Sequence, residues 1–350
     1  MRDVAIVSPV RTAVGSFGGG LKDVSAAELG ATVIKAVLER TGLEPDKIDE
    51  VILGHGYPSG EEPAIGRLCA LKAGLPIEVP GYQLDRRCSS GLQAILNACM
   101  MVQTGNADVV LAGGVESMSR VEFYTTDMRG GSRLGSVTLH DRLTRARATA
   151  SPEERFGVIS GMIETAENLS ERHHVTREEQ DAYALRSHQC AVAAVESGKF
   201  AAEIVPVSIP QRRGEPKLFQ VDEGPRQDTS LEVLAKLRPI TSGGTVTAGN
   251  ASSQNDAASV CLVVAGDKLD ELGLRPMAFL RGWAVAGVHP AYMGIGPVPA
   301  VEKTFARTGL TWDDIDLIEL NEAFAAQVLA VLKGWKLESW EKKIQVEMNV

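Results

Sequence analysis

Residues 40–49 read Arg-Thr-Gly-Leu-Glu-Pro-Asp-Lys-Ile-Asp, and residues 307–316 read Arg-Thr-Gly-Leu-Thr-Trp-Asp-Asp-Ile-Asp. A helical pattern precedes each copy, and a short apolar run follows it. In each copy we expect a helix to end at the glycine and a turn to follow, with the isoleucine packed beneath a sheet before the next strand begins. The simplest interpretation of this repeat is a chain built from two similar halves.

Short apolar runs that predict buried strands recur along the chain, with helical patterns between several of them. The expected strands are Val4–Val7, Glu50–Leu53, Val109–Ala112, Val260–Val264, Ala278–Leu280 and Leu317–Leu320. The expected helices include Ala26–Arg40, Ser90–Gln103 and Ala300–Arg307. Alternation of strands and helices predicts an α/β fold with parallel strand pairing.

The stretch between the two halves has a different character, rich in polar loops and one long amphipathic helical section. We therefore expect an N-terminal half at residues 1–119, an inserted subdomain at 120–249 and a C-terminal half at 250–350. The second half is expected to be incomplete. A long stretch follows Gly42 in the first copy, whereas the sequence ends soon after Gly309 in the second.

Composition narrows the class of protein. The formal net charge is −9, and no segment is strongly basic, so a nucleic-acid partner is not expected. No apolar run reaches the roughly 18 residues that a membrane-spanning helix needs. The N-terminus reads as a strand and lacks the apolar core of a signal peptide. We expect a cytoplasmic enzyme.

The five cysteines are widely scattered and form no disulfide framework. No Cys-x-x-Cys pair occurs, so no zinc or other metal site is expected. Most of these side chains are expected to be small buried hydrophobes, with at most one or two chemically active. They are Cys69, Cys88, Cys99, Cys190 and Cys261.

One cysteine has a distinctive setting, in the stretch Asp85-Arg86-Arg87-Cys88-Ser89-Ser90-Gly91-Leu92-Gln93-Ala94. Small residues there allow a sharp turn from an extended segment into a helix, which would expose the sulfur. A helix N-terminus favours the thiolate over the thiol, and a backbone N–H beside it can bind the oxygen of a thioester under attack. A buried cysteine at a helix cap is the alternative.

Two further stretches are candidates for ligand binding. Asn321-Glu322-Ala323-Phe324-Ala325-Ala326-Gln327 follows the second repeat, where Asn321 could cap a helix or hold a water or a carbonyl oxygen. Gly244–Ser253 is a run of small residues, which forms either a tight turn or a surface where a long thin ligand lies against the backbone.

Together these stretches resemble the thiolase family. Further matching stretches are Val7–Gly19, Gly113–Ser119, Thr165–Asn168, Arg177–Asp181, Glu203–Val207 and Met293–Ala300. They occur in the family's order and spacing and extend over nearly the whole chain, to about Trp335. The Asn-Glu-Ala-Phe form is similar to the acetyl-CoA acetyltransferase and 3-ketoacyl-CoA thiolase groups.

The resemblance implies two five-stranded βαβαβαββ halves in an α/β/α/β/α arrangement, with an inserted loop domain that binds CoA. It implies acetyl-CoA, acyl-CoA and CoA as partners, CoA thioesters as substrates and no separate cofactor. It also implies a homodimer or homotetramer, because the loop at about Tyr124–His140 resembles the region that joins thiolase dimers.

The resemblance also implies roles for particular residues. Cys88 is the implied nucleophile that takes the acyl group as a thioester, and Asn321 holds the water of an oxyanion hole. The implied CoA-binding residues lie over the adenine (Arg226), along the pantetheine (Ala248 and Ser252) and at the acyl end (Met162, Ala323 and Phe324).

The implied reaction is the condensation of two acetyl-CoA to acetoacetyl-CoA, and its reverse, in two half-reactions with ping-pong kinetics. A longer-chain 3-ketoacyl-CoA thiolase is an alternative, because Gly161 and Thr241 stand where short-chain thiolases often carry bulkier residues. A condensing ketoacyl synthase and a non-catalytic CoA-binding protein are two others.

The sequence departs from the family in one major respect. Thiolases carry a Gly-His-Pro motif, whose histidine activates the nucleophile, and a Cys-x-Gly-Gly-Gly motif, whose cysteine moves the α-proton. Neither motif occurs in the 350 residues. Met348-Asn349-Val350 resembles the start of the segment that leads to Gly-His-Pro. We therefore expect a C-terminally truncated chain that is inactive alone.

Overall fold

The computed structural model describes residues 1–337, which divide into two compact units. The first unit comprises Met1–Val121, Lys199–Gly224 and Gln254–Arg281. The second comprises Glu122–Gly198, Pro225–Ser253 and the chain from Gly282 onward. Met348, Asn349 and Val350, which prompted the expectation of truncation, lie outside the described residues.

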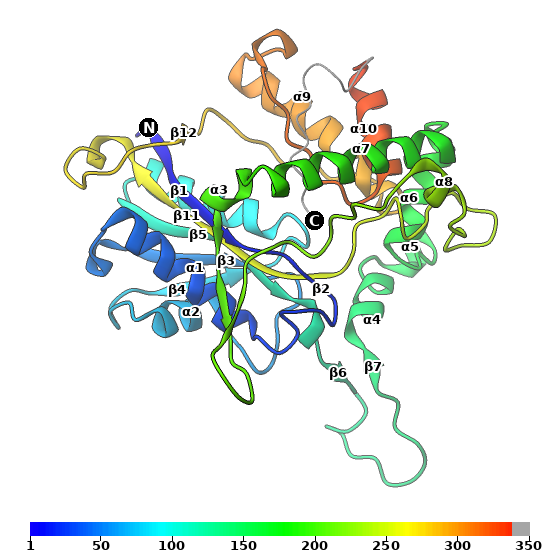
Figure 1. The fold of residues 1–350 in the computed structure, drawn as a ribbon, viewed down its shortest axis with the longest axis horizontal. Helices are drawn as coiled ribbons and strands as arrows, with labels where there is room; N and C mark the ends of the chain where they lie inside the picture. Colours follow the sequence, from blue (N-terminus) through cyan, green and yellow to red (C-terminus); the bar gives the residue numbers. More distant parts are fainter. Residues whose placement is uncertain (338–350) are drawn as a thin grey trace. The chain divides into compact units, whose positions relative to one another are not determined.

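An eight-stranded sheet forms the centre of the first unit (Figure 1). Its main path runs in the order β12 (Ala278–Phe279), β1 (Val4–Thr12), β11 (Asn255–Ala265), β5 (Val109–Ser117), β3 (Glu50–Gly54) and β4 (Gly81–Leu84). Two short strands, β2 (Gly15–Ser16) and β8 (Ile204–Val205), pair with β11 and β1. The sheet is mixed, since β3 is parallel to β4 and β5, whereas β11 is antiparallel to β1 and β5.

Helices cover both faces of this sheet. The helices α1 (Ala26–Thr41) and α2 (Ile65–Ala73) share one core with Val51 and Leu53, whereas α3 (Ser90–Gln103) shares another with Ile52. Successive side chains of a strand point to opposite faces, so a buried strand must be apolar at every position. Because these strands are buried on both faces, they read as unbroken apolar runs in the sequence.

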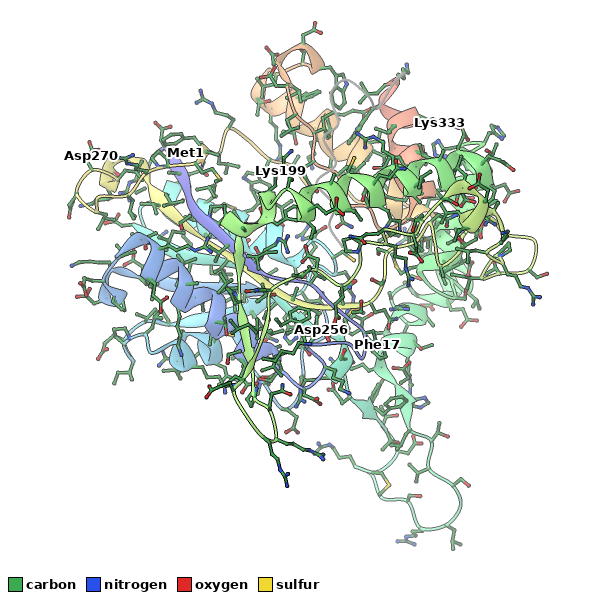
Figure 2. The ribbon with its side chains drawn as sticks, viewed as in Figure 1. Met1, Phe17, Lys199, Asp256, Asp270 and Lys333 are labelled. Carbon is green, nitrogen blue, oxygen red and sulfur yellow. The ribbon has the colours of Figure 1, made fainter. Side chains whose placement is uncertain are left out.

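The first unit also contains short elements at its edges. They are the hairpin strands β9 (Val207–Ile209) and β10 (Lys217–Phe219) and the 3₁₀ turns η1 (Pro45–Lys47), η2 (Met118–Arg120), η3 (Lys199–Ala202) and η4 (Gly266–Lys268). Asp256, at the start of β11 and labelled in Figure 2, is fully buried and accepts hydrogen bonds from the backbone N–H and the hydroxyl of Ser119. Burial raises the pKa of this carboxyl. These bonds join the chain after β5 to the start of β11.

The second unit is mainly helical. Its elements are β6 (Phe123–Tyr124), β7 (His140–Asp141), α4 (Arg142–Ala148), α5 (Glu153–Phe156), α6 (Met162–Arg172), α7 (Arg177–Glu196), α8 (Leu231–Ala235), η5 (Pro290–Ile295), α9 (Pro297–Thr308), η6 (Trp312–Asp314) and α10 (Ala325–Trp335). Its core forms around α10, where Val328, Val331 and Trp335 pack with Val175 and Tyr183. Both β6 and β7 belong to a separate two-stranded ribbon.

The two copies of the repeat share their local structure but not their continuation. As expected, α1 and α9 end at Gly42 and Gly309, in left-handed conformations with φ of 66° and 77°. A 3₁₀ turn follows each, but only the first copy continues into a strand, β3. The strand expected at Leu317–Leu320 is wrong: the structure assigns no strand there, and Leu317 is 59% exposed. A strand needs neighbours for its backbone hydrogen bonds, which β4 and β5 supply to β3.

Long-range pairing assigns β11 to the first unit. The sequence placed residues 250–281 in the C-terminal half, yet β11 lies between β1 and β5 and pairs with both. The other expected strands and helices occur where predicted, although β12 covers only Ala278–Phe279. No helix in the described part of the chain is long and apolar enough to cross a bilayer.

Candidate active site

Cys88 lies in a tight turn between β4 and α3, and it is exposed. Arg87, just before it, has a φ of 50°, which is unusual for a residue with a side chain. Several hydrogen bonds hold this conformation. The Arg86 N–H donates to Ser90 Oγ at 2.8 Å, and Ser90 Oγ donates to the Arg87 carbonyl at 2.6 Å. The turn therefore presents the sulfur at the start of a 14-residue helix, and the alternative of a buried cap cysteine is wrong.

A second set of contacts supports this turn from the side of β3. The Arg87 guanidinium donates from Nη1 to the carbonyl of Gly56 at 2.7 Å, and the Gly56 N–H donates to Glu116 Oε2 at 2.8 Å. Glu116 Oε1 also lies 3.1 Å from Nε2 of the buried His55. These contacts connect the turn to β3 and β5, so the position of Cys88 depends on the sheet.

The other cysteines differ from Cys88 in exposure. Cys69, Cys99 and Cys261 are buried, as expected for small hydrophobes. Burial raises the pKa of Cys69 to about 12, of Cys99 to about 11 and of Cys261 to about 12, so all three remain thiols at neutral pH. Cys190 is also exposed, but it lies within α7 rather than at a helix N-terminus. Cys88 is the best placed nucleophile.

The second unit brings three of the predicted ligand residues together. The Ser252 N–H donates to the Ala323 carbonyl at 3.0 Å, and Ala251 forms a β-bridge with Phe324. The Ala325 N–H donates to the Asn250 carbonyl at 3.0 Å. The loop that ends at Ser252 and the segment that precedes α10 are therefore joined through their backbones.

Asn321 is exposed and does not cap a helix. The helix α10 begins at Ala325 with Phe324 at its N-cap position, three residues beyond Asn321. The capping alternative for Asn321 is therefore wrong. Its amide is available for the water or carbonyl oxygen that the sequence suggested.

The remaining predicted residues lie on separate elements of the second unit. Met162 is the first residue of α6, and Ala248 is exposed in the small-residue loop. Arg226 is exposed, and its N–H donates to His188 Nδ1 on α7 at 3.3 Å. Burial and the nearby Arg226 lower the pKa of His188, which suits the role of a neutral acceptor.

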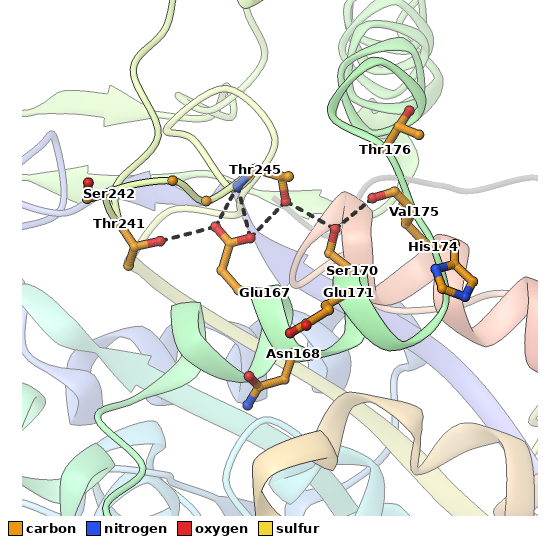
Figure 3. A pocket seen from close by; sticks show the side chains of 12 residues that line it. Glu167, Asn168, Ser170, Glu171, His174, Val175, Thr176, Thr241, Ser242 and Thr245 are labelled. Atoms are coloured by element: carbon orange, nitrogen blue, oxygen red, sulfur yellow. Dashed lines mark hydrogen bonds between the residues drawn. The ribbon is translucent and has the colours of Figure 1, made fainter.

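A cavity of about 600 Å³ in the second unit shows how the small-residue loop is held (Figure 3). The Glu167 carboxylate accepts hydrogen bonds from the backbone N–H groups of Thr245 and Val246 and from the hydroxyls of Thr241 and Thr245, at 2.8–3.3 Å. A Cβ at Gly244 would lie 2.2 Å from Glu167 Oε1, so a larger residue there would have to displace this carboxylate from its hydrogen bonds. Glu167 thus fixes the start of the loop that leads to Ala248 and Ser252.

Sequence reasoning missed the polar residues that anchor these segments. Asn250 is buried and donates from Nδ2 to Asp181 Oδ1 of α7 at 2.9 Å, and Glu322 accepts hydrogen bonds from two other α7 residues. Both lie within stretches that the sequence singled out, Gly244–Ser253 and Asn321–Gln327, but local pattern assigned neither a role. The only signal was their polarity beside buried elements, since buried polar groups require partners.

An exposed cysteine at the start of a helix, in a turn held by a mixed α/β sheet, is typical of enzymes that form a covalent acyl intermediate. The family model for the thiolase N-terminal domain matches residues 4–267, and that for the thiolase C-terminal domain matches residues 274–348. The chain belongs to the thiolase family. The predicted thiolase fold is thereby confirmed.

Relatives of known name agree with this assignment. The chain is 47% identical over 337 residues to an acetyl-CoA acetyltransferase of Chromobacterium violaceum and 46% identical over 339 residues to one of Pseudomonas aeruginosa. These alignments cover 95% and 96% of this chain and 84% and 85% of the relatives. The crystal structure of the Bacillus anthracis acetyl-CoA acetyltransferase superposes with a TM-score of 0.93 at 45% identity, covering 98% of this chain and 85% of that one.

These matches do not support the expected truncation. The expected inactivity of the chain alone is not addressed by them. Both stay predictions.

Proposed function

We propose that this thiolase is an acetyl-CoA C-acetyltransferase that works through an acyl thioester on Cys88. The observation that carries the proposal is the exposed Cys88 sulfur at the start of α3, in a chain whose named relatives are acetyl-CoA acetyltransferases. A helix N-terminus stabilises a negative charge beside it, which favours attack by the thiolate.

The proposed reaction has two half-reactions. The Cys88 thiolate attacks the carbonyl carbon of acetyl-CoA, the carbon–sulfur bond to CoA breaks, and CoA leaves. A second acetyl-CoA then loses an α-proton, which in thiolases passes to the cysteine of the Cys-x-Gly-Gly-Gly motif. Its enolate carbon attacks the acyl-Cys88 carbonyl, which releases acetoacetyl-CoA and the free thiolate. Each oxyanion needs fixed donors, each worth about 3 kcal/mol, and we assign the Asn321 amide to one such site through a bound water.

CoA recognition is proposed for the second unit. Arg226 is assigned to the adenine, Ala248 and Ser252 to the pantetheine, and Met162, Ala323 and Phe324 to the acyl end. Supporting this assignment, the Ser252 N–H donates to the Ala323 carbonyl, which keeps the pantetheine and acyl-end residues adjacent. Apart from the CoA thioester substrates, no cofactor is proposed.

We assign the protein to the cytoplasm and to a homodimer or homotetramer, with residues 124–140 joining dimers. Several apolar side chains of this stretch are exposed, among them Leu134 at 96% and Leu139 at 64%. Exposed apolar patches mark interaction surfaces. Light scattering of the purified chain gives the number of subunits.

Acetylation of Cys88 is the first test of this function. The purified chain is incubated with acetyl-CoA, and the acetylated residue is located by peptide mass spectrometry. We expect one acetyl group on Cys88, none in a Cys88→Ala variant, and unchanged labelling in a Cys190→Ala variant, which removes the other exposed cysteine. Labelling of Cys190 alone, or of no cysteine, would contradict the proposal.

Turnover of acetoacetyl-CoA and CoA is measured on the same sample. Because Gly-His-Pro and Cys-x-Gly-Gly-Gly do not occur in these 350 residues, the general base and the proton shuttle are missing from them. The start of α3 still favours the Cys88 thiolate without that base, so we expect slow acetylation without appreciable turnover. Rapid thiolysis would show that the predicted inactivity is wrong while supporting the thiolase function.

A further inference from the structure

Glu322 is a partly buried carboxylate next to the proposed oxyanion-hole residue Asn321. Both of its oxygens accept hydrogen bonds from α7: Oε1 from the Tyr183 hydroxyl at 2.7 Å, and Oε2 from the Ser187 hydroxyl at 2.7 Å. Tyr183 and Ser187 are themselves buried, at 3% and 8% exposure. Burial raises the pKa of Glu322. Taking a carboxylate out of water is costly unless it is hydrogen-bonded, and the two α7 hydroxyls supply those hydrogen bonds.

A second anchor joins the neighbouring loop to the same helix. Asn250 Nδ2 donates to Asp181 Oδ1 at 2.9 Å, and Asp181 Oδ2 accepts from Arg177 Nε at 2.8 Å. The N–H of Ala325 donates to the carbonyl of Asn250. Contacts therefore run in a closed ring from α7 to Asn250, across to the segment before α10, and back to α7 through Glu322.

This ring holds two irregular segments that have little regular structure of their own. Fixing the backbone of an irregular residue costs about 1–2 kcal/mol, so such segments keep one conformation only where side chains anchor them. Glu322 lies between Asn321 and Ala323, so docking its side chain on α7 restricts the backbone on both sides. The Ala323 carbonyl is then placed to accept from the Ser252 N–H.

We propose that Glu322 is a positioning residue that, with Tyr183 and Ser187, holds the Asn321–Phe324 segment in the conformation that binds the acyl part of acyl-CoA. The inference rests on the proposed function, since it takes Ala323 and Phe324 as acyl-end residues. We propose no contact between Glu322 and the substrate. It acts through its neighbours, so its loss weakens binding of the acyl group rather than of CoA itself.

The test compares two ligands in a Cys88→Ala background, where acetyl-CoA stays intact. The Kd values for CoA and for acetyl-CoA are measured by calorimetry before and after the double change Tyr183→Phe and Ser187→Ala. These changes remove both hydroxyl donors and leave the other side-chain atoms in place. We expect the Kd for acetyl-CoA to rise about tenfold, with the Kd for CoA changed less than about twofold.

Matched variants separate this role from general stability. Glu322→Gln keeps the shape of the side chain and can still hydrogen-bond both hydroxyls. It should therefore retain the affinity for acetyl-CoA that Glu322→Ala loses. Thr149→Val with Ser197→Ala removes two exposed hydroxyls elsewhere in the second unit and should change neither Kd. If the double variant does not fold, Ser187→Ala alone should shift acetyl-CoA binding in the same direction by a smaller factor.

Three results would overturn the inference. A lower Tm with both Kd values unchanged would reduce Glu322 to a stabilising residue. Equal weakening for both ligands would indicate a general disturbance of the site. If the Cys88→Ala chain binds neither ligand, the proposed function itself fails and the inference fails with it. This outcome is distinguished from the other two because it is measured before Tyr183 and Ser187 are changed.

Discussion

Single residues set the position of Cys88, the proposed nucleophile. The strand β3 and the start of α3 approach so closely at Gly54 that an added Cβ would lie 2.3 Å from the Ser90 carbonyl carbon and 2.4 Å from the Gly91 nitrogen. These are backbone atoms, so no side chain can move aside. The glycine is therefore a requirement of the Cys88 turn, whose geometry the adjacent Ser90 hydroxyl also holds.

Gly54→Ala is expected to lower the free energy of unfolding by about 3 kcal/mol and to slow alkylation of Cys88, because α3 must shift away from β3. Urea unfolding and the rate of iodoacetamide labelling measure the two effects. Gly60→Ala is the control, since nothing lies within 4 Å of its added Cβ. Equal stability of the two variants would show that the start of α3 accommodates a Cβ at Gly54 without loss of stability.

Helices and loops carry the second level of organisation. The loop from Thr241 to Ser252 has no regular structure over most of its length. Glu167 of α6 holds its start, and a hydrogen bond from Asn250 to Asp181 of α7 holds it near its end. A carboxylate that accepts several backbone N–H bonds is a strong anchor, because charged hydrogen bonds are about twice as strong as neutral ones. The loop's conformation thus depends on two helices.

Glu167→Ala is expected to raise the Kd for CoA about tenfold, because the Thr245 and Val246 N–H groups lose their acceptor and the loop reaching Ala248 loosens. Glu171→Ala is the matched control. It lines the same cavity from the same helix, and no side-chain hydrogen bond holds the loop to it in the described structure. Calorimetry with CoA measures both variants, and equal affinity would contradict this role of Glu167.

The whole chain is organised by segments that return to the first unit. After leaving at Val121, the chain comes back as Lys199–Gly224, which is tied to β1 by an ion pair. Asp222, with only 2% of its side chain exposed, accepts from Arg11 Nη1 at 2.8 Å, from Arg11 Nη2 at 3.0 Å and from the Val14 N–H at 2.8 Å. This bidentate pair joins distant parts of the sequence.

Asp222→Ala should lower the free energy of unfolding by about 3 kcal/mol, since the Val14 N–H loses its acceptor and the Arg11 guanidinium keeps only Glu203 and the Thr12 carbonyl as partners. Asp267→Ala removes a similar carboxylate from Arg2, but that carboxylate is 64% exposed, so little change is expected. Urea unfolding measures the free energy of unfolding of both variants. A loss no larger for Asp222 than for Asp267 would show that the buried pair is not important.

Much of the fold was predictable from local pattern. The strands β1, β3, β5 and β11 each contain an unbroken apolar run because both faces of the sheet are buried there, and the glycine signals correctly ended α1 and α9. The Leu317–Leu320 run looked the same but forms no strand in the described structure, because an apolar run becomes a strand only beside a partner.

The sequence by itself determined the thiolase family, from motifs in order along the chain, and the turn at Cys88, because the small residues adjacent to it allow that turn. Only the tertiary structure placed β11 between β1 and β5, excluded Asn321 as a helix cap and assigned partners to Glu167 and Glu322. These features depend on contacts between residues dozens to hundreds of positions apart, and local polarity and periodicity do not specify which distant groups meet.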